Sequence, residues 1–219
     1  MRPFIHVNCA MSADGKIAGP ERKQVTISTE EDLLRVRNLR KHYDAILVGV
    51  GTIVADDSHL TIKGAYRDAN PIRIVIDPNG RTPDNARVLD NVAPTVIVTC
   101  GDCKKTWSDS ITVIRTGTDR LILADAMESL ARDYDIKNIL VEGGGTTIAS
   151  FFRENMVDKY TVFVSGMIIG GKDAPTPVEG DDWVVPGGIR LDLKSTEVFG
   201  NGVLLTFIPK YRPIKEMCQ

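Results

Sequence analysis

The residues best suited to chemistry form one run, Glu142–Thr147, in which a carboxylate is followed by three glycines and two threonines. The apolar segment Asn138–Val141 before it predicts a strand, and Ile148–Asn155 after it predicts a helix. Glycines between a strand and a helix let backbone N–H groups face a ligand, and the helix N-terminus adds partial positive charge. The run therefore predicts a phosphate-binding turn with Glu142 at its edge. The run is neither a Walker loop nor a complete G-x-G-x-x-G, so it does not identify which phosphorylated ligand would bind.

A second glycine cluster follows another apolar run and begins at Gly49 and Gly51. It is not a dinucleotide fingerprint, because Val54 stands where Gly or Ala is needed and no isolated acidic residue follows about 20 positions later. An ordinary Rossmann dehydrogenase is therefore disfavoured. Asp56 and Asp57 lack a third acidic ligand and make a poor metal site. Their alternative is a solvated turn or a helix cap.

A third polar cluster follows the first predicted strand, where Asp14-Gly15 is a turn signal. The simpler interpretation is a polar turn between two elements. The functional interpretation is that Ala10 and Met11 line a pocket, since open α/β sheets bind ligands at the carboxyl ends of their strands.

Basic residues give a further indication of an anionic ligand. Arg37, Arg40 and Lys41 lie near the end of a predicted helix, and Lys63 and Arg81 lie in predicted loops. Cations near a helix C-terminus are also explained by the macrodipole, at a few tenths of a kcal/mol each. A phosphorylated substrate would equally need them, and spacing alone does not separate the two explanations.

Composition sets the class of protein. The chain has 219 residues, of which 42% are hydrophobic and 26% charged, with a formal net charge of −2. That charge gives no global reason to bind nucleic acid or an anionic membrane. No apolar run reaches the ~20 residues of a membrane span, and the N-terminus lacks a signal-peptide pattern, so we expect a cytoplasmic protein. Cys100 and Cys103 have C-x-x-C spacing, but no second ligand pair supports zinc, and a turn is the favoured interpretation.

The order of the apolar segments predicts an α/β fold. Strands alternate with helices at first and lie next to one another at the end, which indicates a mostly parallel central sheet with antiparallel C-terminal strands and helices on both faces. We expect a single domain over residues 1–219, with 209–219 as a surface tail. Predicted strands are Ile5–Ala10, Ala45–Val50, Pro71–Asp77, Thr95–Thr99, Ile111–Ile114, Asn138–Val141, Lys159–Val164, Leu191–Val198 and Gly202–Ile208; predicted helices are Thr29–Lys41, Leu121–Asp133 and Ile148–Asn155.

Five motifs in order resemble the pyrimidine reductases of riboflavin biosynthesis, which share a dihydrofolate-reductase-like fold. They are S-x-D-G-K-I-A from Ser12, D-A-I-L-V-G-V-G-T-I-x-x-D-D-x-x-L-T from Asp44, N-P-I-R-I-V-I-D from Asn70, L-V-E-G-G-G-T from Leu140 and I-G-G-K-x-A-P-T from Ile169. The resemblance covers about residues 3–208 and is greatest to the stand-alone archaeal and fungal type. Bacterial relatives carry a fused zinc deaminase, whose H-x-E and P-C-x-x-C motifs do not occur in this sequence.

The resemblance implies NADPH as the cofactor, with NADH as the alternative, and no metal. By position, the residues expected to contact the cofactor are Ala10, Thr52, Asp56, Gly144, Gly145, Thr146 and Thr147. Arg81 is the candidate for the 2′-phosphate, because relatives often carry Ser in the turn where this chain has Pro78-Asn79-Gly80-Arg81. Substrate contacts are expected at Arg40, Leu60, Lys63 and Glu142, with the two cations on the ribose 5′-phosphate. Ser12 and Asp14 are expected only to shape the pocket.

The implied reaction opens a phosphorylated ribosylaminopyrimidine to an imine and reduces C1′ by hydride transfer, which yields the ribitylamine. Glu142, or less favourably Asp56, would stabilise the protonated imine or relay a proton. Alternatives are another reductase of the same fold and a non-catalytic nucleotide-binding module. The family also implies a homodimer, for which the apolar segment Lys159–Ile169 is the interface candidate.

Overall fold

A computed structural model describes residues 1–22, 25–62, 64–180 and 188–211. The expected substrate contact Lys63, and residues 212–219 of the expected tail, lie outside these ranges. Within the described residues, nine strands form one sheet in the order β5-β4-β3-β2-β6-β1-β7-β9-β8. The strands are β1 Phe4–Ser12, β2 Ala45–Gly49, β3 Ile72–Ile76, β4 Thr95–Cys100, β5 Thr112–Thr116, β6 Asn138–Gly143, β7 Lys159–Ser165, β8 Arg190–Phe199 and β9 Gly202–Lys210.

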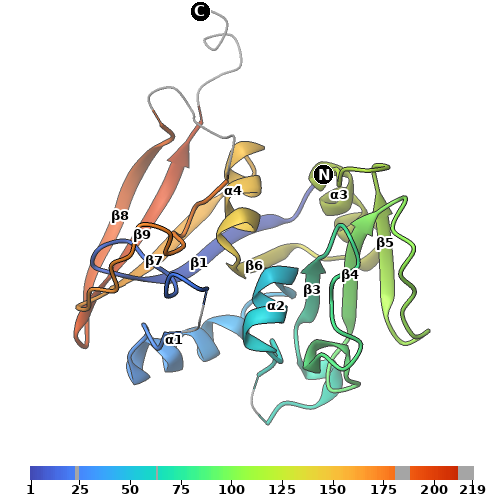
Figure 1. The fold of residues 1–219 in the computed structure, drawn as a ribbon, viewed down its shortest axis with the longest axis horizontal. Coiled ribbons are helices and arrows are strands. Elements are labelled where there is room, and N and C mark those ends of the chain that lie inside the picture. The colour runs from blue at the N-terminus through green and yellow to red at the C-terminus, as the bar shows by residue number, and fades with distance from the viewer. Residues whose placement is uncertain (23–24, 63, 181–187, 212–219) are drawn as a thin grey trace, which may run out of the picture.

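The direction of the strands confirms the predicted mostly parallel sheet. All pairs from β5 through to β7 are parallel, whereas β9 pairs antiparallel with both β7 and β8. In Figure 1 the antiparallel strands β8 and β9 lie at one side of the twisted sheet, and β3, β4 and β5 lie at the other. The parallel strands β1, β2 and β6 in the middle all end at the same edge, where the residues expected to do chemistry lie.

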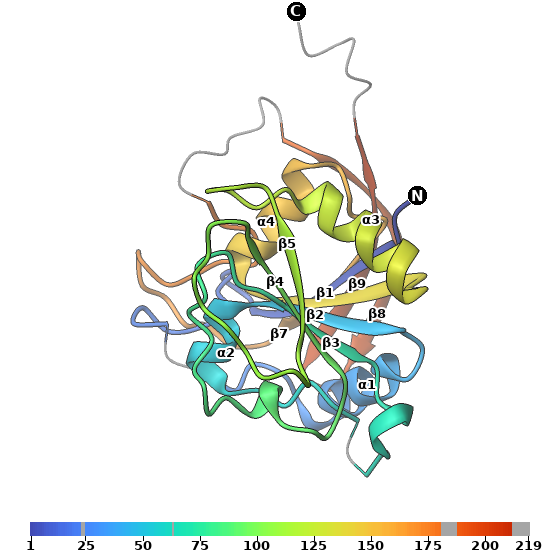
Figure 2. The same cartoon turned by 90° about the vertical axis from the view of Figure 1, so that its right-hand side faces the viewer.

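Helices cover both faces of the sheet, as expected, and strand β2 is apolar on both sides. Ala45 and Leu47 of β2 belong to one hydrophobic cluster, and Ile46 and Val48 belong to another. The first cluster includes α3 and α4, and the second includes α2; Figures 1 and 2 show α3 and α4 together on one face, with α1 and α2 on the other. The helices are α1 Glu30–Arg40, α2 Val50–Asp56, α3 Leu123–Tyr134 and α4 Gly145–Arg153, with short 3₁₀ turns at η1 Arg67–Ala69 and η2 Arg87–Leu89.

Helix α1 begins and ends as expected, but it buries a different face. The apolar spacing predicts that Leu33 and Leu34 face the core, whereas they are 41% and 56% exposed. The buried residue is Asp32, whose carboxylate accepts a hydrogen bond from Arg35 Nε at 2.8 Å. Arg35 Nη2 in turn donates to Asn8 Oδ1 on β1 at 2.9 Å. The helix packs a polar face because the strand surface beneath it is polar.

Three other expectations are corrected at element boundaries. Helix α2 begins at Val50, which was expected to end a strand, and α4 begins at Gly145, three residues before the expected Ile148. Strand β9 runs to Lys210, so Pro209 and Lys210 belong to the sheet and not to a tail. Strand β7 lies between β1 and β9 with most of its side chains buried, so the part Lys159–Ser165 of the expected interface lies inside the sheet, whereas Ile168 after it is 72% exposed.

A histidine buried beneath α1 should make stability depend on pH. His6 Nε2 lies 2.7 Å from Thr161 Oγ1, and Nδ1 contacts the Tyr43 hydroxyl. Burial, aided by the positive charges of Lys159 and Arg35, lowers the pKa of His6 to about 3. Since the folded-state pKa lies below the unfolded one, folding favours the neutral ring. This stabilisation is complete above pH 6.5 and is lost as the pH falls toward 3, at up to roughly 1.4 kcal/mol per pH unit.

We therefore expect His6→Gln to flatten the dependence of the unfolding free energy on pH between 6.5 and 4.5. Urea unfolding at several pH values measures it, and the difference between variants removes the contribution of carboxylates. His42→Gln, at an exposed position, is the control and should retain the slope of the wild type. Identical slopes for His6→Gln and the wild type would contradict the assignment.

Candidate active site

Two helices begin next to each other at the edge where the central strands end. Strand β2 ends at Gly49 and leads directly into α2, and β6 ends at Gly143 and leads through Gly144 into α4. The two strands are paired, with Val48 opposite Gly143. Gly144 has a φ of +80°, which favours glycine, and its carbonyl accepts the first hydrogen bond of α4 from Ile148 N at 2.9 Å. The strand order thus brings the two glycine clusters of the sequence into one junction.

Two threonine hydroxyls fill this junction, and the glycines are what give them room. A Cβ at Gly49 would lie 2.2 Å from Thr147 Oγ1, and one at Gly144 would lie 3.3 Å from the same atom. A Cβ at Gly143 would lie 3.4 Å from Thr52 Oγ1. Thr52, Gly144 and Thr147, which were expected to contact one cofactor, therefore lie together although they come from separate parts of the chain.

The start of α4 is covered by the segment that follows β7. Glu179 N donates to the Gly145 carbonyl at 3.3 Å, and the Thr146 hydroxyl donates to Glu179 Oε1 at 3.4 Å. The same carboxylate oxygen lies 2.8 Å from Arg22 Nη1. A Cβ at Gly145 would lie 2.4 Å from the Thr176 carbonyl oxygen. The carboxylate of Glu179 thus lies against the N-terminal turn of α4, and a helix N-terminus favours a negatively charged group.

Glu142 forms a two-point ion pair with Arg40. Arg40 Nε donates to Glu142 Oε1 at 2.8 Å, and Nη2 donates to Oε2 at 2.6 Å, while Nη1 donates to the Thr61 carbonyl at 3.0 Å. The Arg40 side chain is 20% exposed and that of Glu142 is 9% exposed. Burial alone would lower the pKa of Arg40, but the facing charge and hydrogen bonds of Glu142 leave it raised. Two residues expected to touch substrate are therefore joined, with Arg40 orienting the carboxylate.

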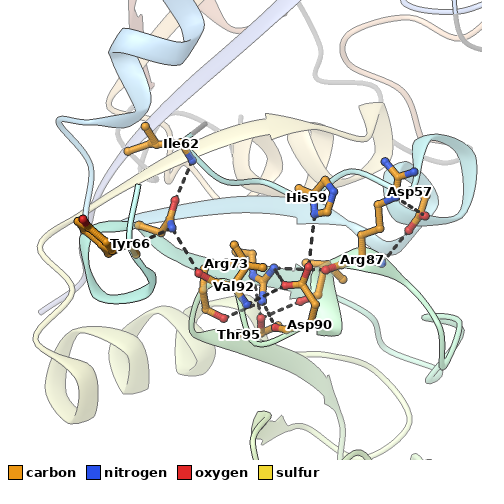
Figure 3. A network of polar contacts seen from close by, with 12 residues as sticks. Asp57, His59, Ile62, Tyr66, Arg73, Arg87, Asp90, Val92 and Thr95 are labelled. Atoms are coloured by element: carbon orange, nitrogen blue, oxygen red, sulfur yellow. Dashed lines mark hydrogen bonds and ion pairs between the residues drawn. The ribbon is translucent and has the colours of Figure 1, made fainter. Parts of the chain in front are cut away.

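The segment that contains Leu60 is linked through His59 and Asp90 to a buried arginine. Arg73 of β3 has a fully buried side chain that donates to Asp90 Oδ1 at 2.8 Å and to Thr95 Oγ1 at 2.9 Å. Figure 3 shows His59 pointing to the same Asp90 from the segment after α2, at 3.5 Å. Leu60 itself is 3% exposed and has a φ of +52°. An arginine inside the apolar strand Ile72–Ile76 is the one sign of this network that is visible in the sequence.

The remaining expected cofactor residues, which are Ala10, Asp56 and Arg81, do not join the glycine junction. Ala10 is half-buried near the end of β1, and Asp56 ends α2, where burial raises the pKa of its carboxyl. Arg81 is exposed in a turn that Asp77 builds by accepting from Arg81 N at 2.8 Å. Among the described residues, no hydrogen bond or ion pair links Asp56 or the Arg81 side chain to the turn at Gly144.

Two other features of the chain concern metals and membranes. Within the described ranges, no group of three His, Cys, Asp or Glu residues is arranged to hold a metal ion. Cys100 ends β4, and Cys103 N donates to its carbonyl at 3.3 Å, so the C-x-x-C spacing forms the expected turn. None of the helices in the described part of the chain has the length and apolar character of a membrane span.

A mostly parallel sheet with an antiparallel C-terminal pair, helices on both faces and two glycine-bounded helix starts at its centre defines an α/β domain of the dihydrofolate-reductase-like class. Within this class, the chain belongs to the family of the RibD C-terminal domain, whose model matches residues 3–205.

Relatives of nearly the same length share about a third of their residues with this chain. It is 37% identical to the 2,5-diamino-6-ribosylamino-4(3H)-pyrimidinone 5′-phosphate reductase of Methanothermobacter thermautotrophicus, covering 96% of this chain and 100% of that protein. The protein of the same name from Archaeoglobus fulgidus is 35% identical, with 94% and 98% covered. Among solved structures, a Thermotoga maritima diaminohydroxyphosphoribosylaminopyrimidine deaminase/5-amino-6-(5-phosphoribosylamino)uracil reductase aligns with a TM-score of 0.77 at 25% identity, over 95% of this chain and 57% of that one.

The glycine junction makes a prediction about packing. Gly49→Ala places a methyl group against Thr147 Oγ1, so we expect it to lower the unfolding free energy by about 1–3 kcal/mol. Gly51→Ala is the matched control two residues away: its Cβ would meet no atom within 4 Å, and Ala is the better helix former, so it should be neutral or stabilising. Denaturant unfolding measures both. Adding Thr147→Ala to Gly49→Ala should recover part of the loss, and failure to recover any would show that the hydroxyl is not the clashing group.

Proposed function

We propose that the protein reduces the ribosylamino group of 2,5-diamino-6-(5-phosphoribosylamino)pyrimidin-4(3H)-one to the ribitylamino group in riboflavin biosynthesis, with NADPH as the reductant. The observation that carries this proposal is that the glycine junction and the Arg40–Glu142 ion pair lie next to each other at one edge of the sheet. It occurs in a chain that is 35% and 37% identical, over nearly its whole length, to two archaeal proteins named as this reductase.

The residues at the junction fit a dinucleotide. Gly144, Gly145, Thr146 and Thr147 would hold its pyrophosphate on the N-terminal turn of α4, where backbone N–H groups and helix polarity favour an anion. The Glu179 carboxylate against Thr146 is an anionic group at this turn already, and a pyrophosphate would displace it or lie beside it. Thr52 and Asp56 would contact the cofactor from α2, and Arg81 would face a 2′-phosphate.

The chain's own groups would bind and orient the substrate. NADPH, when bound, supplies the hydride that reaches C1′ of the ring-opened substrate. Ala10, a small residue near the end of β1, leaves room for the nicotinamide end. Glu142 would stabilise the positive charge of the protonated imine, which accepts hydride more readily than the neutral form. Asp56 is the less favoured candidate for this role.

The hydrogen bonds of Arg40 favour a role other than the one expected from the sequence, which was to bind the ribose 5′-phosphate. With Nε and Nη2 on Glu142 and Nη1 on the Thr61 carbonyl, it has few N–H groups left for a phosphate. We therefore propose that Arg40 chiefly positions Glu142, that Leu60 contacts the substrate next to them, and that Lys63 supplies the main charge for the ribose 5′-phosphate. The homodimer and the cytoplasmic location stay predictions from the sequence.

The reaction is tested by following NADPH absorbance at 340 nm with the purified full chain. We expect oxidation that depends on the phosphoribosylaminopyrimidine, and a ribitylamino product by mass spectrometry. Binding of NADPH without oxidation would favour a non-catalytic nucleotide-binding module instead. Oxidation with dihydrofolate but not with the pyrimidine would assign the chain another reaction of the same fold.

Glu142 is the residue whose replacement should most affect turnover. Glu142→Gln keeps the size of the side chain but removes its charge and leaves one acceptor oxygen for the two N–H groups of Arg40, so we expect kcat to fall by about 10²-fold or more. The NADPH dissociation constant should stay within about threefold, because the carboxylate faces the substrate. Unchanged kcat with an unchanged pH profile would rule out a catalytic role. Glu128→Gln, at an exposed position on α3, is the control.

A further inference from the structure

The loop after β1 is fastened to the segment after β7 by one carboxylate. Asp14 Oδ1 accepts from Ile169 N at 3.1 Å, and Oδ2 accepts from Gly170 N at 2.8 Å. Ser12 Oγ also donates to Asp14 Oδ1, at 2.6 Å. Two successive backbone N–H groups, with Gly170 at a φ of +73°, form the kind of concavity that binds an anion. Here the anion is a side chain of the protein itself.

Three further hydrogen bonds join the same two segments. Ala13 N donates to the Met167 carbonyl at 2.8 Å, Ile17 N to the Pro175 carbonyl at 2.9 Å, and Lys16 Nζ to the Ala174 carbonyl at 3.0 Å. Asp14 nevertheless differs from these contacts, because it is the charged group and holds two adjacent N–H donors. Its pKa is lowered to about 2, first by the Ser12 hydroxyl and then by the N–H groups of Ile169 and Gly170. The carboxylate is therefore charged throughout the working pH range.

The far end of the fastened segment lies on the start of α4. The chain runs from Met167, beside Ala13, to Glu179, which bonds to Gly145 and Thr146. We call residues 167–179 the covering segment. Its first part is held by Asp14 and its last part lies against the turn at which we place the cofactor pyrophosphate. A change in how the first part is held therefore reaches that turn through about ten residues of chain.

We infer that Asp14 is a positioning residue that holds the covering segment in the place needed for cofactor binding at the α4 N-terminus. This inference rests on the proposed function for the identity of the cofactor. It assigns Asp14 a role that its sequence position did not reveal: Asp14, oriented by the Ser12 hydroxyl, acts on the binding turn through the covering segment, without contacting the turn.

The test compares Asp14→Ala, Asp14→Asn and the wild type as full-length proteins. Asp109→Ala is the matched control, since Asp109 is exposed and has no polar partner among the described residues. Amide hydrogen exchange read by mass spectrometry should rise about tenfold over residues 167–179 in Asp14→Ala and stay unchanged in α3. The dissociation constant for NADPH should rise roughly tenfold, while kcat at saturating NADPH stays within about twofold. Asp14→Asn keeps one acceptor oxygen, so its exchange rate and its NADPH dissociation constant should lie between those of the wild type and Asp14→Ala.

Each result decides between positioning and a merely structural role. Unchanged exchange over residues 167–179 in Asp14→Ala would overturn the inference, and so would raised exchange with an unchanged NADPH dissociation constant. A lower melting temperature of Asp14→Ala, together with equal weakening of NADPH and pyrimidine binding, would also overturn the inference, since a general loss of stability would then explain the data. If the wild type binds NADPH without oxidising it in the presence of the pyrimidine, the proposed function fails, but the exchange and NADPH-binding arms still decide the role of Asp14.

Discussion

The contact between Gly49 and the Thr147 hydroxyl is the constraint on which the arrangement of the site depends. Two helices can begin at neighbouring strand ends only if their first turns approach closely, and here the approach leaves no room for a side chain on Gly49. The neighbouring Gly143 and Gly144 extend the same close approach to Thr52. The glycines therefore serve two purposes at once. They let the two helix starts meet, and they leave the surface of the junction lined by backbone and hydroxyl groups suited to a phosphorylated ligand.

This junction also explains where the charges of the site lie. Glu142 lies one residue before the junction on β6, the strand between β2 and β1. A carboxylate that is 9% exposed is costly to bury alone, and the two-point contact with Arg40 offsets that cost. Because Arg40 stands at the end of α1, the packing of that helix on β1 contributes to the orientation of the Glu142 carboxylate. The polar contact of Arg35 with Asn8 thus matters to the site although neither residue belongs to it.

The sequence predicted well the features that depend on local pattern. Apolar runs such as Thr95–Thr99 and Asn138–Val141 became strands, and the change to adjacent strands at the end predicted the antiparallel pair. Features that depend on the partner surface were not predictable. The leucines of α1 have helical spacing, yet the strand beneath them presents His6 and Asn8, so the helix buries Asp32 instead. The ion pair of Arg40 with Glu142 joins residues 102 positions apart, a contact that no local spacing encodes.

The five motifs behind the family resemblance are each weak, and the structure shows a physical reason why they occur together. The motif from Ser12 and the motif from Ile169 are bonded to each other through Asp14, Lys16 and Ile17. Thr176, at the end of the motif from Ile169, lies against Gly145 of the motif from Leu140, and Gly143 and Gly144 of that motif meet Thr52 of the motif from Asp44. Each of these four motifs is thus one side of a contact whose other side is another motif, and the motif from Asn70 joins them because its strand β3 pairs with β2 of the motif from Asp44. A chain that kept only one of them would keep a turn with no partner, whereas the set together builds one continuous edge around the proposed cofactor site.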